Sequence, residues 1–225
     1  MNANNAQKLK LDSGKAGAVS ALLLRPQRPR ACFVFAHGAG AGMTHPFMQA
    51  FAEGLLARDI ASLRYQFPSM EKASKRPDPP AIAQATVRAA VAEAARVLPG
   101  LPLIAGGKSF GGRMTSQAQA AASLQGVRGL AFLGFPLHAS GKPSTDRAAH
   151  LGDIHIPMLF LQGTRDSLAE VKLIDGVAKG LAPSATLHLV DGADHSFHVL
   201  ARSGRNDREV LAQILDIFAC WAGGI

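Results

Sequence analysis

Apolar segments of strand length alternate with amphipathic helical segments along most of this 225-residue chain. Residues 31–36 (ACFVFA) form a continuous apolar run, which is typical of a strand covered on both faces in a parallel sheet. Such alternation predicts βαβ units, hence a mainly parallel twisted sheet with helices on both faces. The carboxyl ends of parallel strands meet at one edge, and ligands bind at that edge.

The individual elements follow from the same periodicities. Two strands at 8–12 and 18–25 predict an antiparallel opening. The later strands are predicted at 31–36, 60–67, 103–105, 127–135, 158–162 and 185–190. Helices are predicted from Pro46 onward and at 78–98, 113–122, 167–181 and 206–221. Residues 68–80 and 136–156 are expected to be connections, the second with one helical turn near 147–151 and too short for a cap domain.

Length and composition limit the class of protein. A chain of this length is most simply one domain, here residues 1–225 with a core at about 18–222. Hydrophobic residues make up 48% of the chain and charged residues 18%, which excludes global disorder. No apolar run approaches the roughly 18 residues of a membrane span, and the N-terminus lacks the apolar core of a signal peptide. We therefore expect a cytoplasmic location and no membrane insertion.

The formal net charge of +8 is unevenly distributed, at +11 for residues 1–150 and −3 for 151–225. Lys72, Lys75 and Arg76 in the 68–80 connection could attract an anionic substrate, although a solvated charged loop is the more ordinary interpretation. The positive residues are scattered and no nucleic-acid-binding motif is present, so no nucleic-acid partner is expected. The sequence leaves open whether the chain forms a homo-oligomer.

The cysteines and histidines give no support for a metal site. Cys32 and Cys220 are far apart in apolar segments, and we expect both to be buried free thiols. The eight histidines include no H-E-x-x-H or H-x-H cluster. No metal or organic cofactor is expected.

A pentapeptide, Gly107-Lys108-Ser109-Phe110-Gly111, lies where the 103–105 strand gives way to a helix. It fits G-x-S-x-G, the nucleophile elbow, in which a serine sits on a sharp strand-to-helix turn between small neighbours. A flexible glycine-rich loop is the alternative. A phosphate-binding loop fits worse, because the first glycine that the Walker spacing requires before Gly107 and Lys108 is absent.

Serine needs an adjacent base to act as a nucleophile, usually a histidine oriented by a carboxylate. Ser109, Asp166 and His195 all follow predicted strands, in the order nucleophile–acid–base. Asp166 could instead only cap the next helix, with Asp153 and Asp175 as poorer candidates for the acid. The alternatives to His195 are His198 and the strand residue His188, and Asp194 is an alternative partner for His195.

Six segments carry a resemblance to a known superfamily: HGAGAGM (37–43), RYQFPSM (64–70), KRPDPP (75–80), GKSFGGRM (107–114), LQGTRD (161–166) and DGADHSF (191–197). Over about 18–222 the chain resembles the α/β-hydrolase superfamily. More narrowly, it resembles a small lidless group related to dienelactone hydrolases, which includes a testis-expressed hydrolase-like protein and a domain of a histone-acetyltransferase complex subunit.

The resemblance implies hydrolysis of a small ester or thioester through an acyl-enzyme, and it does not define the substrate. It implies that the backbone amides of Phe110 and Ala39, or alternatively Gly40, form an oxyanion hole. His37 is expected to brace that loop. The alternative function is a catalytically silent hydrolase-like scaffold that serves as an interaction module.

Overall fold

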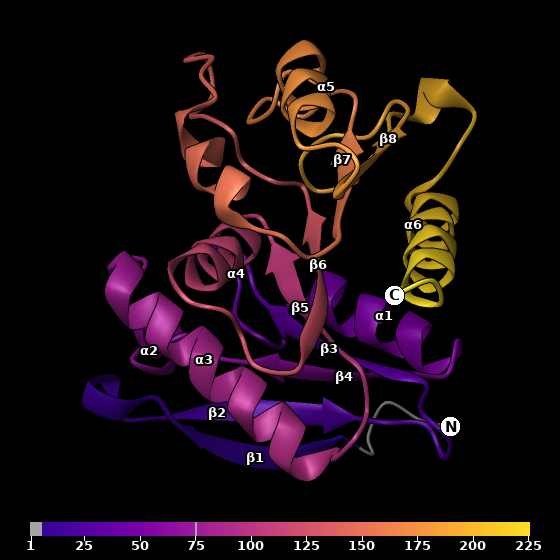
Figure 1. Cartoon of the computed structure of the whole chain (residues 1–225). Helices are drawn as coiled ribbons and strands as arrows, with labels where there is room; N and C mark the ends of the chain where they lie inside the picture. The colour runs from indigo at the N-terminus through magenta and orange to yellow at the C-terminus, as the bar shows by residue number, and fades with distance from the viewer. Residues whose placement is uncertain (1–5, 75) are drawn as a thin grey trace.

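The computed structural model describes residues 6–74 and 76–225, and its strands form one eight-stranded sheet (Figure 1). The order across the sheet is β1-β2-β4-β3-β5-β6-β7-β8. The strands are β1 (Gln7–Asp12), β2 (Ala18–Leu24), β3 (Ala31–Ala36), β4 (Ile60–Tyr65), β5 (Leu103–Lys108), β6 (Val127–Leu133), β7 (Met158–Gly163) and β8 (Ala185–Val190).

Strand β2 runs antiparallel to both of its neighbours, and all other adjacent pairs are parallel. The register sets Ala36 at the end of β3 beside Tyr65 of β4 and Gly107 of β5. Three carboxyl strand ends therefore lie side by side at the centre of the sheet. The loops that leave those ends, and those after β7 and β8, carry the predicted functional residues.

The helices are α1 (Pro46–Leu56), α2 (Pro68–Glu71), α3 (Pro80–Val97), α4 (Phe110–Ala121), α5 (Val171–Gly180) and α6 (Asp207–Ala222). Short 3-10 helices occur at Gly14–Ala16, Asp146–Asp153 and Ala201–Ser203. The prolines at the start of α1, α2 and α3 suit the first helical turn, where an amide would have no partner. Helix α6 begins with a capping box between Asn206 and Glu209.

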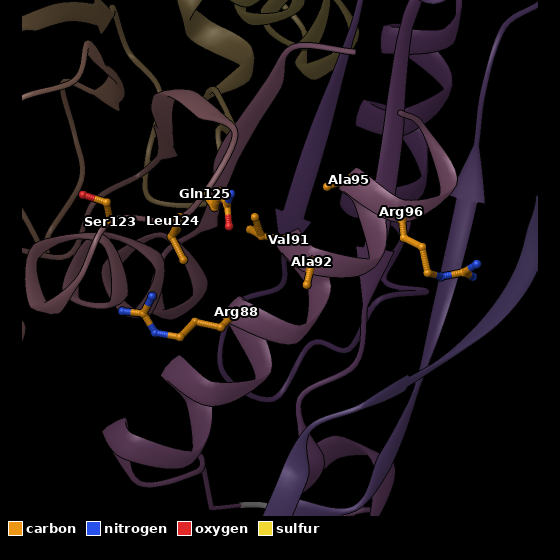
Figure 2. A pocket seen from close by; sticks show the side chains of 8 residues that line it. All are labelled: Arg88, Val91, Ala92, Ala95, Arg96, Ser123, Leu124 and Gln125. Carbon is orange, nitrogen blue, oxygen red and sulfur yellow. The ribbon is translucent and has the colours of Figure 1, made fainter. Parts of the chain in front are cut away.

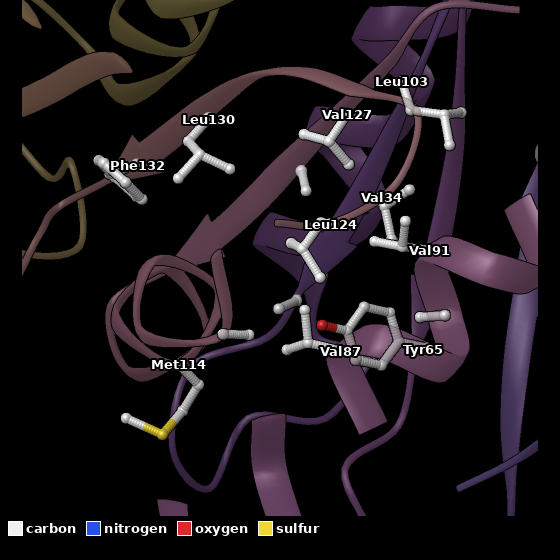
Figure 3. Close-up of a cluster of buried hydrophobic side chains, with 14 of the residues drawn as sticks. Val34, Tyr65, Val87, Val91, Leu103, Met114, Leu124, Val127, Leu130 and Phe132 are labelled. Carbon is white, nitrogen blue, oxygen red and sulfur yellow. The ribbon is translucent and has the colours of Figure 1, made fainter. Parts of the chain in front are cut away.

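Two hydrophobic cores occupy the two faces of the sheet. Along β3, Phe33 and Phe35 pack with helices α1 and α6, whereas Val34 faces the opposite core. Figure 3 shows that opposite core, where Val87 of α3 and Met114 of α4 lie with strand residues and with the buried ring of Tyr65. This arrangement confirms the expected mainly parallel sheet with helices on both faces, and it explains why β3 is apolar throughout.

Two local predictions are corrected by the structure. The expected loop at 68–80 begins with the short helix α2, whose second amide, Ser69 N, donates to Asp78 Oδ2 at 2.8 Å. The helix expected from Ser167 begins only at Val171, because turns occupy the preceding segment. Leu168 N donates to the Asp166 carboxylate at 2.8 Å in that segment, which binds the side chain locally instead of starting the helix.

The prediction of two buried thiols is half wrong. Cys32 is fully buried on β3, and burial raises its thiol pKa to about 12. Cys220 is exposed. On α6 the buried stripe includes Ile214, Phe218 and Ala222, and residue 220 falls on the opposite side of the helix. Apolar neighbours in sequence therefore did not indicate burial here.

The connection from β6 to β7, residues 134–157, contains only loops and the 3-10 helix Asp146–Asp153, and it adds no cap domain over the strand ends. The expected helical turn is present and is longer than predicted. Across residues 6–74 and 76–225, no helix has both the length and the apolar character needed to cross a membrane.

Candidate active site

Ser109 lies at the sharp turn between β5 and α4. Its backbone has φ 50° and ψ −117°, a region that non-glycine residues rarely adopt. Such a conformation costs on the order of 1–3 kcal/mol and is found mainly at functional sites. The strain lifts the serine side chain out of the strand and toward the loops at the carboxyl edge.

The two glycines of the pentapeptide are required by close backbone packing. A Cβ atom on Gly107 would lie 2.3 Å from the carbonyl oxygen of Ala36. A Cβ on Gly111 would lie 2.5 Å from the carbonyl oxygen of His37. Both distances are far below van der Waals contact, so any side chain would push the elbow away from the end of β3. The glycines thus hold the serine beside the loop that follows β3.

Ser109, His195 and Asp166 are brought together by three different loops. His195 Nε2 lies 2.9 Å from Ser109 Oγ, and His195 Nδ1 lies 2.7 Å from Asp166 Oδ2. The Asp166 side chain is completely buried, whereas the imidazole is 23% exposed. These are hydrogen-bond distances for a nucleophile, a base and an orienting acid. The arrangement is what serine-based acyl transfer requires.

The Asp166 carboxylate accepts hydrogen bonds from two groups besides the His195 imidazole. Gln162 at the end of β7 donates Nε2–H to Oδ2 at 2.5 Å, and Leu168 N donates to Oδ1. Gln162 Oε1 in turn accepts the Phe135 amide at 2.8 Å. Both carboxylate oxygens are therefore fixed in direction. Sequence reasoning missed Gln162, although a glutamine ending the apolar run MLFLQ was a signal, since a buried amide needs partners.

The structure distinguishes Asp166 from the other candidates for the acid and excludes it as the cap of α5. Helix α5 has Glu170 at its N-cap position, so Asp166 does not cap it. Asp175 lies within α5 and pairs with Lys179 at 2.7 Å. Asp153 ends the 3-10 helix of the β6–β7 connection. Of these carboxylates, Asp166 is the one hydrogen-bonded to His195.

The alternative candidates near His195 do not take part in the Ser109–His195–Asp166 arrangement. Asp194 Oδ1 accepts the amides of Ser196 and His198, which shapes the loop from within. The exposed His198 Nδ1 pairs with Asp207 at the start of α6 at 2.8 Å. His188 is exposed on the edge strand β8. Asp194 therefore does not orient the His195 ring.

His37 braces the loop after β3, as predicted. It is buried, its Nδ1 bonds the Gly38 carbonyl oxygen at 2.7 Å, and its Nε2 accepts the Phe67 amide at 3.0 Å. These partners place the proton on Nδ1, and burial lowers the pKa of the ring. A neutral His37 thus ties the loop to the end of β4.

A second attachment of the same loop comes from β4 and the residue after it. The Met43 amide donates to Gln66 Oε1 at 2.7 Å, and a guanidinium nitrogen of Arg64 donates to the Met43 carbonyl oxygen at 3.2 Å. Arg64 is buried, and burial lowers its pKa. The segment RYQF therefore fixes loop 37–43 at both ends, a role that the sequence pattern alone did not reveal.

Ala39 and Phe110 belong to the two segments that meet at Ser109. Phe110 is the first residue of α4, and Ala39 is exposed in a turn closed by Ala41 N and Gly38 O at 3.2 Å. A Cβ on Gly38 would lie 3.8 Å from Ser109 Cβ, which puts this turn against the nucleophile elbow. Within the described part of the chain, neither the Ala39 nor the Phe110 amide has a hydrogen-bond acceptor. Both amides are available to a ligand.

A cavity of about 350 Å³ opens over Ser109. Its walls combine the glycine-rich turn, the start of α1 and the His195 loop, and apolar side chains dominate. The lining residues are Gly38, Ala39, Ala41, His45, Phe47, Met48, Lys108, Ser109, Leu168, His195 and Ser196. Lys72 and Arg76 do not line it and are exposed, while Lys75 lies outside the described residues. This size suits a small acyl group.

A larger groove of about 580 Å³ lies elsewhere, between α3 and the segment after α4 (Figure 2). Its Ser123 has neither a histidine nor a carboxylate among the other lining residues. Arg88 in this groove donates to the carbonyl oxygens of Ala118 and Ala122, which caps the C-terminal end of α4. We therefore interpret the groove as a helix-packing feature. Over the described ranges, no group of three His, Cys, Asp or Glu residues could hold a metal ion.

Comparison with known proteins identifies the fold. A family model described as an alpha/beta hydrolase domain matches residues 29–223. Among solved structures, a serine hydrolase without a lid from Xanthomonas campestris is 20% identical, with 96% of this chain and 94% of that chain covered and a TM-score of 0.74. A dienelactone hydrolase from Anabaena variabilis is 17% identical, with 96% of each chain covered and a TM-score of 0.78. An esterase domain from Rhodothermus marinus is 14% identical, with 97% of this chain and 98% of that chain covered and a TM-score of 0.72. The chain therefore belongs to the α/β-hydrolase domain family and has the lidless form of that fold.

Proposed function

We propose that this protein is a serine hydrolase that cleaves small esters or thioesters through an acyl-enzyme. The observation that carries the proposal is the continuous hydrogen-bonded chain from Ser109 through His195 to the buried Asp166, which opens into a cavity. A dienelactone hydrolase and an esterase domain of the same fold support this class of chemistry. The narrower similarity to a testis-expressed hydrolase-like protein and an acetyltransferase subunit stays a prediction.

In the acylation step, Ser109 Oγ attacks the substrate carbonyl carbon while His195 Nε2 accepts the hydroxyl proton. Asp166 holds the imidazole through Nδ1 and stabilises the positive charge that develops on it. The amides of Phe110 and Ala39 donate to the carbonyl oxygen as it becomes negative. The bond to the alcohol or thiol then breaks, and the leaving group takes the proton from His195.

In the deacylation step, water enters on the side that the leaving group has vacated. His195 removes a proton from this water as its oxygen attacks the acyl carbon. Collapse of the second tetrahedral intermediate releases the carboxylic acid and returns the proton to Ser109. The cavity lies open to solvent at the strand ends, and the β6–β7 connection adds no lid, so water and small or surface-presented substrates have access.

A fluorophosphonate probe tests the nucleophile directly. The wild type should be labelled at Ser109, as located by mass spectrometry, whereas Ser109→Ala and His195→Ala should lose labelling. Ser140→Ala, which changes an exposed loop serine, is the matched control and should label normally. Labelling at another serine, or no labelling of the folded wild type, would contradict the proposal. The second result would favour a silent scaffold.

A panel of p-nitrophenyl esters then measures acyl preference. Phe47, Met48 and Leu168 line the 350 Å³ cavity, so acetate and butyrate esters should be turned over faster than esters of long fatty acids. Matched thioesters in the same assay compare the two leaving groups. Preference for long chains would contradict the assignment of this cavity as the acyl site.

A further inference from the structure

Lys108, at the first variable position of the pentapeptide, contacts the loop that carries His195 directly. It precedes Ser109 at the end of β5, and its Nζ donates to the backbone carbonyl oxygen of His195 at 2.5 Å. One side chain therefore connects the residue next to the nucleophile with the backbone of the base. The two segments are 87 residues apart in sequence.

The ammonium group lies in a confined space beside the imidazole. Its Nζ is 5.5 Å from the centre of the Phe197 ring, a distance at which a cation is attracted to the aromatic face. A Cβ on Gly134 would lie 3.0 Å from Nζ and 3.4 Å from His195 Cε1. The glycine after β6 thus leaves room for the lysine end and the imidazole together.

Lys108 retains its position at an electrostatic cost. Burial lowers its pKa to about 8, and the more distant carboxylates of Asp166 and Asp194 oppose that shift. Within the described residues, no carboxylate forms an ion pair with Nζ. An apolar side chain of similar length would avoid this desolvation. The Lys108 ammonium group is therefore buried at a cost in desolvation, and its hydrogen bond is made to the loop that carries His195.

The loop that Lys108 contacts is itself strained. Phe197 has φ 64°, a left-handed conformation that is unfavourable for a bulky residue. The turn is closed from within by Asp194 N to His198 O at 2.9 Å and by Phe197 N to Asp194 O at 3.0 Å. These bonds shape the turn but do not attach it to the nucleophile elbow. The Lys108 bond attaches the backbone of this turn to the elbow, in addition to the side-chain bond between His195 Nε2 and Ser109 Oγ.

We propose that Lys108 is a positioning residue, which holds the His195 backbone so that the imidazole stays within hydrogen-bond distance of Ser109. The inference rests on the proposed hydrolase function. Because Lys108 acts through the carbonyl group of His195, it takes no proton from substrate. Misplacement of a reacting group by about 1 Å can slow turnover about a hundredfold. Loss of this one donor should therefore reduce the rate of chemistry more than substrate affinity.

The test replaces Lys108 with methionine, which has a similar length and no donor. Lys172→Met, an exposed lysine on α5, is the matched control. In the Lys108→Met variant, kcat for p-nitrophenyl acetate and the rate of fluorophosphonate labelling should fall about tenfold to a hundredfold, with KM within about twofold. The melting temperature should not fall. A purely structural lysine would give the opposite result: a lower melting temperature and an unchanged kcat for the folded protein.

A second readout does not depend on turnover. The proton shared between His195 Nδ1 and Asp166 should give a downfield resonance in one-dimensional proton NMR of the wild type. This resonance should broaden or vanish in Lys108→Met and persist in Lys172→Met. An unchanged resonance together with unchanged labelling would overturn the inference. If the methionine variant does not fold, Lys108→Leu, which also lacks a donor, takes its place with the same criteria. If the wild type lacks labelling, the hydrolase proposal fails while the resonance still tests Lys108.

Discussion

Ser109, the proposed nucleophile, has a backbone conformation that suits glycine better than serine. Its φ of 50° and ψ of −117° place a Cβ in a crowded region of the turn. The chain accepts this cost because the strand-to-helix turn points the hydroxyl toward His195, 2.9 Å away. Strain at this residue is thus tied to the position of the reactive atom, and it can be measured without any substrate.

Ser109→Gly should be more stable than Ser109→Ala by about 1–2 kcal/mol. Both variants lose the hydroxyl group, so the difference isolates the effect of a Cβ at positive φ. Urea unfolding followed by tryptophan fluorescence gives the two free energies of unfolding. Ser140→Gly and Ser140→Ala provide the same comparison at an exposed loop position. An alanine variant as stable as the glycine variant would show that the elbow is not strained.

The side-chain amide of Gln162 forms two hydrogen bonds, one to the Asp166 carboxylate and one to the Phe135 amide. Gln162→Leu removes the donor to Asp166 Oδ2 and the acceptor of the Phe135 amide. The orphaned amide should cost about 1–3 kcal/mol of stability, measured by urea unfolding. The loosened carboxylate should lower kcat about tenfold.

Gln125→Leu, at an exposed position, is the control and should leave both quantities unchanged. If Gln162→Leu loses stability but retains full kcat, then Asp166 is oriented adequately by the Leu168 amide alone. The comparison therefore separates the structural from the orienting contribution of this glutamine.

At the scale of elements, hydrophobic periodicity was sufficient to predict most of the strands and helices. The run at 31–36 and the strand at 185–190 have the predicted bounds. The run at 31–36 is apolar throughout and flanked by turns, so its sequence leaves few alternatives. Helix α5 was predicted too early, since Asp166 and its turn occupy the residues before Val171. Hydrophobic periodicity does not reveal a local side-chain hydrogen bond of this kind, so it could not predict the later start of α5.

The grouping of the candidate site residues was predictable where chemistry demands particular residue types in a particular order. Ser109, Asp166 and His195 could be chosen from motif and strand position, and the structure brings them within hydrogen-bond distance. Gln162 and Lys108 could not be chosen in that way. Their roles depend on which backbone groups the fold brings to them, and those groups lie 27 and 87 residues away.

The loop at 37–43 is held as a unit by neighbouring elements, and its attachment is testable. Gln66→Leu removes the acceptor of the Met43 amide, while His37 still bonds the Phe67 amide. The loosened turn should orient the Ala39 amide poorly, so kcat should fall about tenfold with KM within about twofold. Steady-state kinetics on p-nitrophenyl acetate measures both quantities.

Gln27→Leu, an exposed residue before β3, is the matched control. Equal loss of activity in the two variants would point to a general effect of leucine on folding. A larger KM with unchanged kcat for Gln66→Leu would indicate that the loop shapes the substrate pocket and does not stabilise the transition state.

At the scale of the whole molecule, the candidate site is assembled from five strand ends. The loops after β3, β5, β7 and β8 supply the reactive and bracing groups, and the end of β4 holds the first of them. Lys108 spans from the central strand β5 to the loop after the edge strand β8. Its charge should therefore affect the stability of the entire fold.

The stability of the wild type relative to Lys108→Met should depend on pH. Burial lowers the pKa of Lys108 from its ordinary 10.5 to about 8, against the attraction of Asp166 and Asp194. Between these values the unfolded chain binds more protons than the folded chain, so wild-type stability rises with pH across that window. Below about pH 8 the ammonium is charged in both states and the penalty is constant.

The measurement is the difference in urea midpoint between wild type and Lys108→Met from pH 6 to pH 10. We expect the difference to be flat up to about pH 7.5 and then to shift in favour of the wild type as the folded amine loses its proton. Lys172→Met, at an exposed position on α5, is the control for the loss of one lysine side chain. A difference that stays flat to pH 10 would mean that Lys108 titrates like a solvated lysine. That result would show that burial beside His195 does not lower the pKa of Lys108.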